Sequence, residues 1–158
     1  MTLLYSSSPE DTFALGAALG MQLQPGDSVL LTGDLGAGKS VLARAIASAL
    51  GVEGSMPSPT FTLMQPYDGH VPVSHFDLYR LEEPEEFYAA GLDEYMGGSF
   101  VSLVEWPLDG IDVSPAVRVF IDRADDDNAR QITIGFGGID SARQTDITLA
   151  LKQWGACT

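Results

Sequence analysis

The segment Gly33–Ser40 constrains the fold of this chain more than any other feature. It reads Gly-Asp-Leu-Gly-Ala-Gly-Lys-Ser and matches the pattern G-x-x-x-x-G-K-[ST] of a phosphate-binding loop. Glycines let the backbone turn tightly and bring its N–H groups against phosphate oxygens, and the following helix points the positive end of its dipole at the same anion. The motif therefore predicts a unit of strand, loop and helix.

The residues on either side of the motif supply that context. Ser28–Thr32 is a short apolar run without polar alternation, which is typical of a strand buried on both faces. A helical pattern runs from Lys39 to Leu50, and Gly51 ends it. A glycine-rich turn that binds nothing would need neither flank, so we interpret the segment as a functional phosphate loop.

The other expected elements indicate an α/β fold. Ser8 predicts the N-cap of a helix that runs through Met21, with Pro9 in its first turn. Two hairpins, around Asp68-Gly69 and around residues 125–128, force antiparallel pairs beside the parallel ones. Further strands are expected at 60–67, 71–77, 100–104, 117–121 and 131–136, and helices at 84–90 and 146–154.

These elements predict a single P-loop NTPase-like domain over residues 1–158, with a mixed parallel and antiparallel sheet flanked by helices. The segment beyond about residue 140 is the least defined part of this prediction. The four arginines downstream of Arg80 form no close cluster in the sequence; they are Arg118, Arg123, Arg130 and Arg143.

The charge of the chain limits its partners. With 22 acidic and 8 basic residues, the net charge is −14, which argues against broad contact with nucleic-acid backbone or anionic membranes. No run approaches the ~18 apolar residues of a membrane span, and Met1–Tyr5 has no signal-peptide character. The single cysteine, Cys157, cannot form an internal disulfide. We therefore expect a cytoplasmic protein without a membrane partner.

The phosphate loop implies ATP and Mg²⁺ as ligands. Lys39 should reach the β- and γ-phosphates as a mobile positive charge, and the Ser40 hydroxyl should bind magnesium. Guanine-selective members of this class use Asn-Lys-x-Asp, but the only asparagine is Asn128, which Ala129 follows. This favours ATP over GTP. The remaining residues expected to contact the nucleotide at the loop are Gly33, Asp34, Leu35, Gly36, Ala37, Gly38 and Val41.

Two acidic residues are candidates for the chemistry. Asp77 and Glu105 each end an apolar strand, and such strands can bring them to the same edge of the sheet. Asp77 has a short side chain and would hold magnesium, directly or through water. Glu105 reaches further and would orient or polarise the attacking water, and it is also a candidate metal ligand with Asp77 and Ser40. Alternatively, one of them merely caps a strand or meets a surface arginine such as Arg80.

Other polar and aromatic residues allow two interpretations each. Thr60 follows the stiff Ser58-Pro59 pair and either senses the γ-phosphate or simply begins a strand. Trp106 either packs against the end of a strand or forms a docking surface. His70 and His75 have no second histidine or cysteine at ligand spacing, so we interpret them as structural or solvated.

Four blocks in this order and spacing resemble the bacterial TsaE (YjeE) family: Gly33–Ser40, Ser58–Leu63, His75–Arg80 and Leu103–Pro107. The resemblance covers about residues 8–123. It implies the ATPase component of the machinery that makes threonylcarbamoyladenosine on tRNA. In the family, TsaD transfers the threonylcarbamoyl group, TsaB supports TsaD, and TsaE binds the TsaB–TsaD pair. Contact with tRNA is then only indirect, through the complex.

The resemblance also implies residue roles. It assigns phosphate and magnesium contacts to Lys39 and Ser40, and magnesium to Asp77. It assigns hydrolysis and coupling to Glu105 with Trp106. It further raises Thr60 as a switch residue and suggests that Ser8 and Thr12 lie near the adenine. One departure is Val41, since many members carry a second threonine there, so nucleotide affinity is expected to be weaker.

Two rival functions use the same loop. A small-molecule kinase would need an acceptor pocket and usually a lid with several arginines. A nucleotide-sensing module would bind ATP without turning it over. The sparse arginines suggest no internal arginine finger, so an ATPase of this kind would be weak without its partners.

Overall fold

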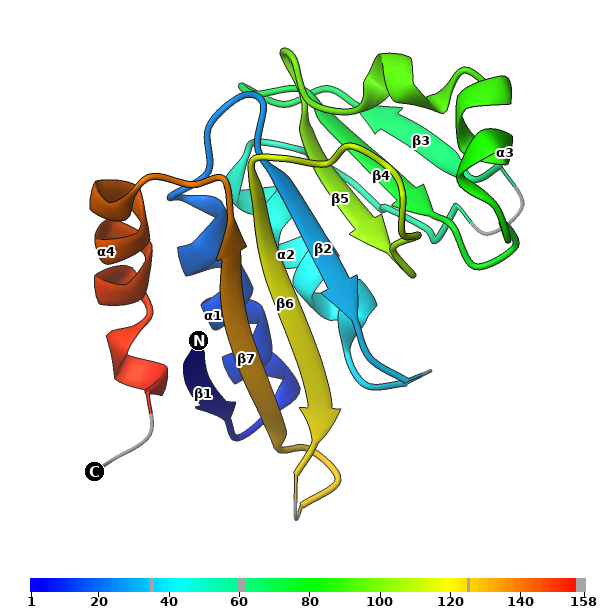
Figure 1. The fold of residues 1–158 in the computed structure, drawn as a ribbon. Helices are drawn as coiled ribbons and strands as arrows, with labels where there is room; N and C mark the ends of the chain where they lie inside the picture. The colour runs from blue at the N-terminus through cyan, green and yellow to red at the C-terminus, as the bar shows by residue number, and fades with distance from the viewer. Residues whose placement is uncertain (35, 60–61, 125, 156–158) are drawn as a thin grey trace.

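The apolar run ahead of the glycine-rich segment forms the strand β2 (Ser28–Thr32), and the helix α2 (Lys39–Ala49) follows it (Figure 1). The computed structural model describes residues 1–34, 36–59, 62–124 and 126–155. The other strands are β1 (Thr2–Ser6), β3 (Met64–Tyr67), β4 (Val73–Asp77), β5 (Val101–Glu105), β6 (Ala116–Arg123) and β7 (Arg130–Gly137). The remaining helices are α1 (Pro9–Gly20), α3 (Pro84–Ala89) and α4 (Ser141–Ala150), with 3₁₀ helices η1 (Leu92–Tyr95) and η2 (Lys152–Trp154).

All seven strands form one mixed sheet in the order β1-β7-β6-β2-β5-β4-β3. The four central strands β6, β2, β5 and β4 are parallel, whereas β3, β7 and β1 join antiparallel. The predicted mixed α/β fold is therefore confirmed. Because parallel strands end at the same edge of a sheet, the phosphate loop after β2 lies beside the ends of β4 and β5.

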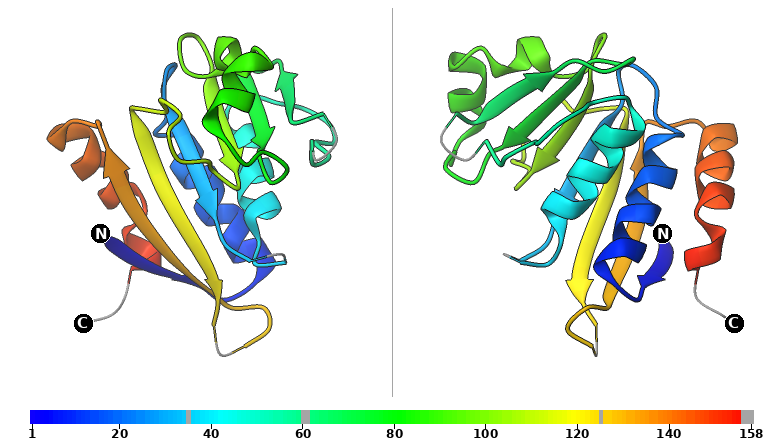
Figure 2. Two further views of the ribbon diagram at one scale, coloured as in Figure 1. Left: turned by 45° about the vertical axis from the view of Figure 1, so that its right-hand side comes forward. Right: turned by 180° about the vertical axis from the view of Figure 1, so that it is seen from behind.

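The helices α1 and α2 cover one face of the sheet (Figure 2). They run side by side in the same direction: a Cβ built at Gly16 would lie 2.7 Å from the Cβ of Ala45, and one at Gly20 would lie 2.8 Å from that of Ala49. Only glycine permits this approach at full packing density. The largest core cluster fills the space between these helices and the sheet, and the N-termini of both helices share one end of the molecule.

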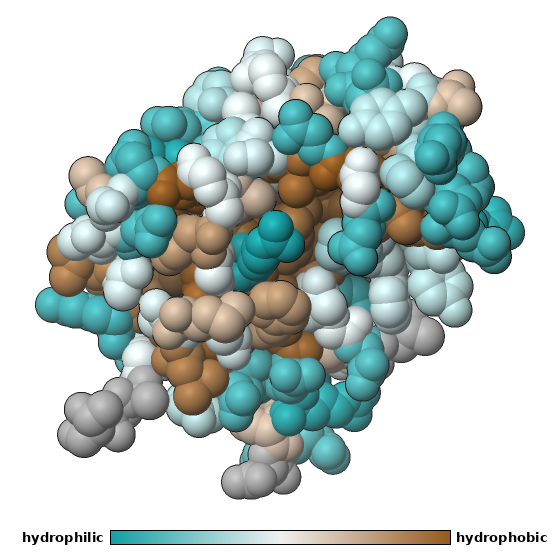
Figure 3. Space-filling model, viewed as in Figure 1, coloured by the Kyte–Doolittle hydropathy of each residue, from teal (hydrophilic) through white to brown (hydrophobic). Residues whose placement is uncertain are grey.

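The opposite face of the sheet is only partly covered. A second core cluster, which includes Phe76 and Phe87, lies under α3, η1 and the segment after β5. On the strands beyond it, Leu3, Tyr5 and Phe120 remain 37%, 44% and 36% exposed. Figure 3 shows apolar residues gathered in a hollow in the middle of this face.

The two ends of the chain differ from expectation. The strand β1 was not expected, and it pairs with β7 at the sheet edge, Thr2 opposite Ile134. The last helix begins at Ser141, earlier than the expected residue 146, because the Asp140 side chain caps it by accepting from the Arg143 amide. The segment beyond residue 140 thus contributes α4, and Ile147 of α4 is buried in the main core.

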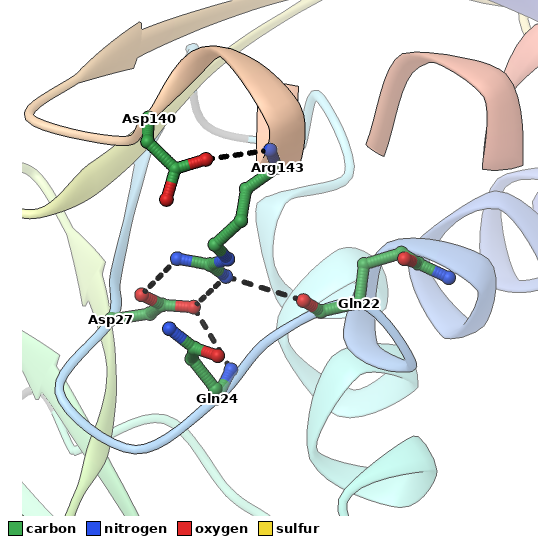
Figure 4. A network of polar contacts seen from close by, with 5 residues as sticks. All are labelled: Gln22, Gln24, Asp27, Asp140 and Arg143. Atoms are coloured by element: carbon green, nitrogen blue, oxygen red, sulfur yellow. Dashed lines mark hydrogen bonds and ion pairs between the residues drawn. The ribbon is translucent and has the colours of Figure 1, made fainter. Parts of the chain in front are cut away.

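An ion pair links α4 to the turn before β2 (Figure 4). Arg143 Nη2 and Nη1 donate to the two carboxylate oxygens of Asp27 at 2.6 and 3.0 Å, and the Gln24 amide donates to the same carboxylate at 2.9 Å. Asp27 is 1% exposed, so its charge depends on these donors. The Asp27 carboxylate also raises the pKa of Arg143, which keeps the guanidinium charged.

None of the helices in the described ranges combines the length and the apolar content that a membrane crossing needs.

Candidate functional site

The phosphate loop takes a backbone path that only glycine permits at two positions. Gly38 is the N-cap of α2 with a φ of 115°, a left-handed conformation that side chains rarely adopt. A Cβ at Gly33 would lie 2.4 Å from the carbonyl oxygen of Ile121 on β6, so no side chain fits there. The predicted order of strand, loop and helix is present. Leu35, another expected contact, lies outside the described residues.

Lys39 is buried at the first turn of α2 and faces three kinds of partner. Its Nζ donates to the Gly33 carbonyl and, at 3.1 Å, to the Asp34 carbonyl. The same Nζ lies 4.2 Å from the centroid of the Trp106 ring, a cation–π contact. Burial lowers the pKa of Lys39, and the attraction of Glu105, Asp34 and Asp77 opposes that shift. An ammonium held only by neutral carbonyls and a ring can exchange them for phosphate oxygens.

The two candidate carboxylates lie side by side at the ends of β4 and β5. Asp77 and Glu105 are register partners, and they are 6% and 4% exposed. Asp77 Oδ1 accepts from the Tyr79 amide at 3.1 Å, and Oδ2 accepts from the Ser58 hydroxyl at 3.3 Å. The loop before β3 therefore contacts the acidic end of β4. The expected meeting of Asp77 and Glu105 at one sheet edge is observed.

His75 is a member of the site that the sequence did not reveal. It is 1% exposed, and its Nε2 donates to Glu105 Oε2 at 2.6 Å. Its Nδ1 has no hydrogen-bond partner within the part of the chain that the structure describes. The histidine is buried rather than solvated, and it holds the carboxylate that we expect to act on water. The sequence held one signal for this role. His75 lies two residues before Asp77 on the same strand, and alternate residues of a strand share a face.

A cavity of about 320 Å³ lies at the carboxyl edge of the sheet, between the phosphate loop and the two carboxylates. Its lining comprises Gly36, Gly38, Lys39, Ser40, Val41, Ser58, Asp77, Glu105 and Trp106. The oxygen donors of Ser40, Asp77 and Glu105 suit Mg²⁺, which prefers few protein ligands and completes its shell with water and phosphate. No group of three His, Cys, Asp or Glu side chains at metal-binding distance occurs among the described residues, so a site made of protein carboxylates alone is not present there.

Five of the described residues that were expected to contact the nucleotide do not line the cavity: Ser8, Thr12, Gly33, Asp34 and Ala37. The Thr12 hydroxyl is buried and bonded to that of Ser6 at 2.6 Å, and the Ser8 hydroxyl caps α1 by accepting from the Asp11 amide. Both lie at the end of α1 that is next to the start of α2, and their proximity to adenine stays a prediction. Thr60 falls outside the described residues.

Two arginines contact the phosphate loop from the β6–β7 hairpin. Arg123 and Arg130 are register partners. Arg130 Nε donates to the Ala37 carbonyl at 2.6 Å, and Arg123 Nη2 reaches the Gly36 carbonyl at 3.5 Å. The two arginines form no close cluster in the sequence, but antiparallel pairing of β6 and β7 brings them together in the fold. They bond to outer carbonyls of the loop and do not line the cavity.

Comparisons with known proteins find relatives over most of the chain. A family model described as "Threonylcarbamoyl adenosine biosynthesis protein TsaE" matches residues 6–132. The chain is 42% identical over 129 residues to the "tRNA threonylcarbamoyladenosine biosynthesis protein TsaE" of Bacillus subtilis, covering 80% of each protein. A protein of the same name from Haemophilus influenzae is 38% identical over 108 residues, covering 67% of this chain and 68% of that protein.

A solved structure is similar over nearly the whole length. The crystal structure of YdiB from Bacillus subtilis superposes with a TM-score of 0.72 at 32% sequence identity, covering 96% of this chain and 93% of that one. The matched region of the family model contains the phosphate loop, Asp77 and Glu105. The chain therefore belongs to the TsaE family.

Proposed function

We propose that this chain binds ATP with Mg²⁺ and hydrolyses it, as the ATPase subunit of the machinery that makes threonylcarbamoyladenosine on tRNA. The observation that carries the proposal is the convergence of Lys39, Ser40, Asp77 and Glu105 on one cavity beside a glycine-rich loop. A lone phosphate loop would support nucleotide binding only. Two buried carboxylates facing the same space add the means to hold a metal and to act on water.

The roles follow from the contacts of each residue. The loop amides and Lys39 bind the β- and γ-phosphates, and Lys39 exchanges the Gly33 and Asp34 carbonyls for phosphate oxygens. Ser40 and Asp77 would hold Mg²⁺, which when bound offsets the charge of the phosphates. Glu105 orients the attacking water and takes up its proton, while His75 holds one of the two carboxylate oxygens in place.

The partner of this ATPase is proposed to be the TsaB–TsaD pair, with tRNA reached only through that complex. The net charge of −14 suits a subunit that docks on proteins and leaves nucleic acid to others. Arg123 and Arg130 both bond to carbonyls of the loop, so their guanidinium groups are engaged there. An arginine from a partner could supply ~10³–10⁵ in rate, so slow hydrolysis by the chain alone is expected. A cytoplasmic location is part of this proposal.

A kinase is the rival that uses the same cavity. It would need a lid with free arginines, yet Arg130 is engaged by the Ala37, Asp127 and Ala129 carbonyls. Transfer to a metabolite would also release ADP without an equal amount of phosphate. The ratio of the two products therefore separates an ATPase from a kinase.

The test is steady-state release of ADP and phosphate by the purified chain, with Mg²⁺ and with EDTA. We expect equal amounts of both products, dependence on Mg²⁺, and loss of the activity in Asp77→Asn. The control is Asp68→Asn, since Asp68 is exposed in the turn between β3 and β4 and lies far along the strand from the cavity. Activity that survives in EDTA and in Asp77→Asn would refute the proposed metal-assisted hydrolysis.

A further inference from the structure

The open face of the sheet leaves the apolar side chains of Leu3, Tyr5 and Phe120 exposed to water. Helices α1 and α2 cover the other face, whereas none of the described helices lies over β6, β7 and β1 on this one (Figure 1). Phe120 of β6 and Leu3 of β1 are register neighbours of the same residue, Thr133, so they share this face. Apolar residues gathered in a hollow on an uncovered face, as in Figure 3, are typical of an interaction site.

Two cavities run together into a groove along this face. The first, of about 420 Å³, lies against β2, β5 and β6, and Phe120 and Arg118 line its far side. The second, of about 250 Å³, lies against Trp106 and Tyr79. They share Thr32, Leu78, Pro107 and Leu108. We call this continuous depression the β6 groove. It extends from the aromatic residues beside the phosphate loop to the middle of β6.

Of the described residues that line the β6 groove, Arg118 alone has a basic side chain. It makes no hydrogen bond or ion pair within the described ranges, and it is exposed. The one acidic residue of the lining, Asp109, is exposed on the segment after β5 and forms no ion pair with it there. An unpaired guanidinium among apolar residues, in a chain with a net charge of −14, is complementary to a carboxylate surrounded by apolar side chains.

We propose that the β6 groove binds a segment of the partner protein that presents apolar side chains and one carboxylate, with the carboxylate paired to Arg118. A second copy of the chain fits less well. Two copies, each with a net charge of −14, would repel each other in such a contact. A nucleic acid would need several clustered cations, and the groove has one.

The position of the groove joins docking to the nucleotide site. Trp106 lines both the groove and the nucleotide cavity. On the cavity side its ring lies 4.2 Å from Lys39 Nζ, and it packs edge-on against Tyr79 with a centroid distance of 5.0 Å. Trp106 has a left-handed φ of 54°, which a non-glycine residue adopts at a cost. A segment bound in the groove therefore touches the ring that contacts the phosphate-binding lysine.

This inference rests on the proposed function for the identity of the partner, the TsaB–TsaD pair. The test measures the affinity of the pair for the wild type, Arg118→Glu and Phe120→Asp by biolayer interferometry. Lys152→Glu is the control, because it makes the same charge change at an exposed residue on η2. A fluorescent ATP analogue is titrated into every variant in parallel, and light scattering reports the oligomeric state.

We expect Arg118→Glu and Phe120→Asp to weaken binding of the pair about tenfold or more. Lys152→Glu should stay within about twofold, as exposed charges outside an interface usually do. All variants should bind the ATP analogue as the wild type does. If both groove variants bind the pair as tightly as the wild type, this inference is wrong and the proposed function stands. If the groove variants instead break a wild-type dimer, the occupant is a second copy. If the wild type itself does not bind the pair, the partner in the proposed function is wrong as well.

Discussion

At the scale of single residues, the site consists of charged groups whose partners are already in place. Glu105 is held by His75, Asp77 by an amide and a hydroxyl, and Lys39 by two carbonyls and a ring. Buried charges without such partners would be costly. Each of these contacts leaves part of the group available, because a carboxylate has several acceptor positions and an ammonium has three donors. These partners therefore fix the position of each charged group at the site.

Replacement of Lys39 by methionine should change both the affinity for ATP and the pH dependence of the free energy of unfolding. We expect Lys39→Met to weaken ATP binding by about 2–5 kcal/mol, the usual loss when one partner of a buried charge pair is removed. Burial lowers the pKa of Lys39 in the folded protein, so the unfolded chain holds this proton more tightly. The quantity to follow is the free energy of unfolding of the wild type minus that of Lys39→Met. This difference should increase as the pH rises through the folded pKa of Lys39 towards the ordinary value of 10.5. Urea unfolding from pH 7 upwards measures this, and an opposite slope would refute the assigned burial effect.

His75 should affect turnover more than nucleotide affinity. In His75→Phe the Glu105 carboxylate loses its donor, and we expect the maximal rate to fall about tenfold or more with little change in KM. His75→Gln retains an N–H at a similar distance and should recover part of the rate. If the two variants have the same maximal rate, or if both lose only thermal stability, the histidine is a structural residue and does not position Glu105.

At the scale of elements, the parts near the phosphate loop are the predictable ones. The loop pattern specifies the strand before it and the helix after it, and β2 and α2 have these positions. The strand ends of β4 and β5 could be expected to meet because parallel strands end at one edge. By contrast, β1 is five residues long, and its partner β7 lies more than a hundred residues away, so local sequence carries little signal for it.

The ion pair between Arg143 of α4 and Asp27 in the turn before β2 also joins two elements of the fold. Arg143→Ala would leave the Asp27 carboxylate buried without its main donor, and we expect a loss of about 2–3 kcal/mol in the free energy of unfolding. The loss should be smaller than for a fully enclosed pair, because the Arg143 side chain is 19% exposed. The double variant Asp27→Asn/Arg143→Ala should recover part of it. Urea denaturation of Arg143→Ala and of the control Lys152→Ala tests this. An equal, small loss in the free energy of unfolding of the two variants would show that the ion pair contributes nothing.

At the scale of the whole molecule, the two faces of the sheet differ in what covers them. One face is closed by α1 and α2 around the main core, and the other keeps a groove that leads to Trp106. The acidic charge and the family could be inferred from the sequence. The groove could not, because Arg118, Phe120, Leu78 and Leu108 become neighbours only through the sheet order and the segment after β5. The same reason applies to the meeting of Arg130 with Ala37.

Phosphate release with and without the TsaB–TsaD pair, for the wild type and for Glu105→Gln, decides whether the chain is an ATPase that its partners stimulate. We expect a slow rate for the wild type alone and a clear rise when the pair is added. Glu105→Gln should still bind ATP and the pair, since Lys39 and Ser40 are unchanged, but its rate should stay at background. A wild-type rate that the bound pair leaves unchanged, or a Glu105→Gln rate equal to that of the wild type, would contradict the claim.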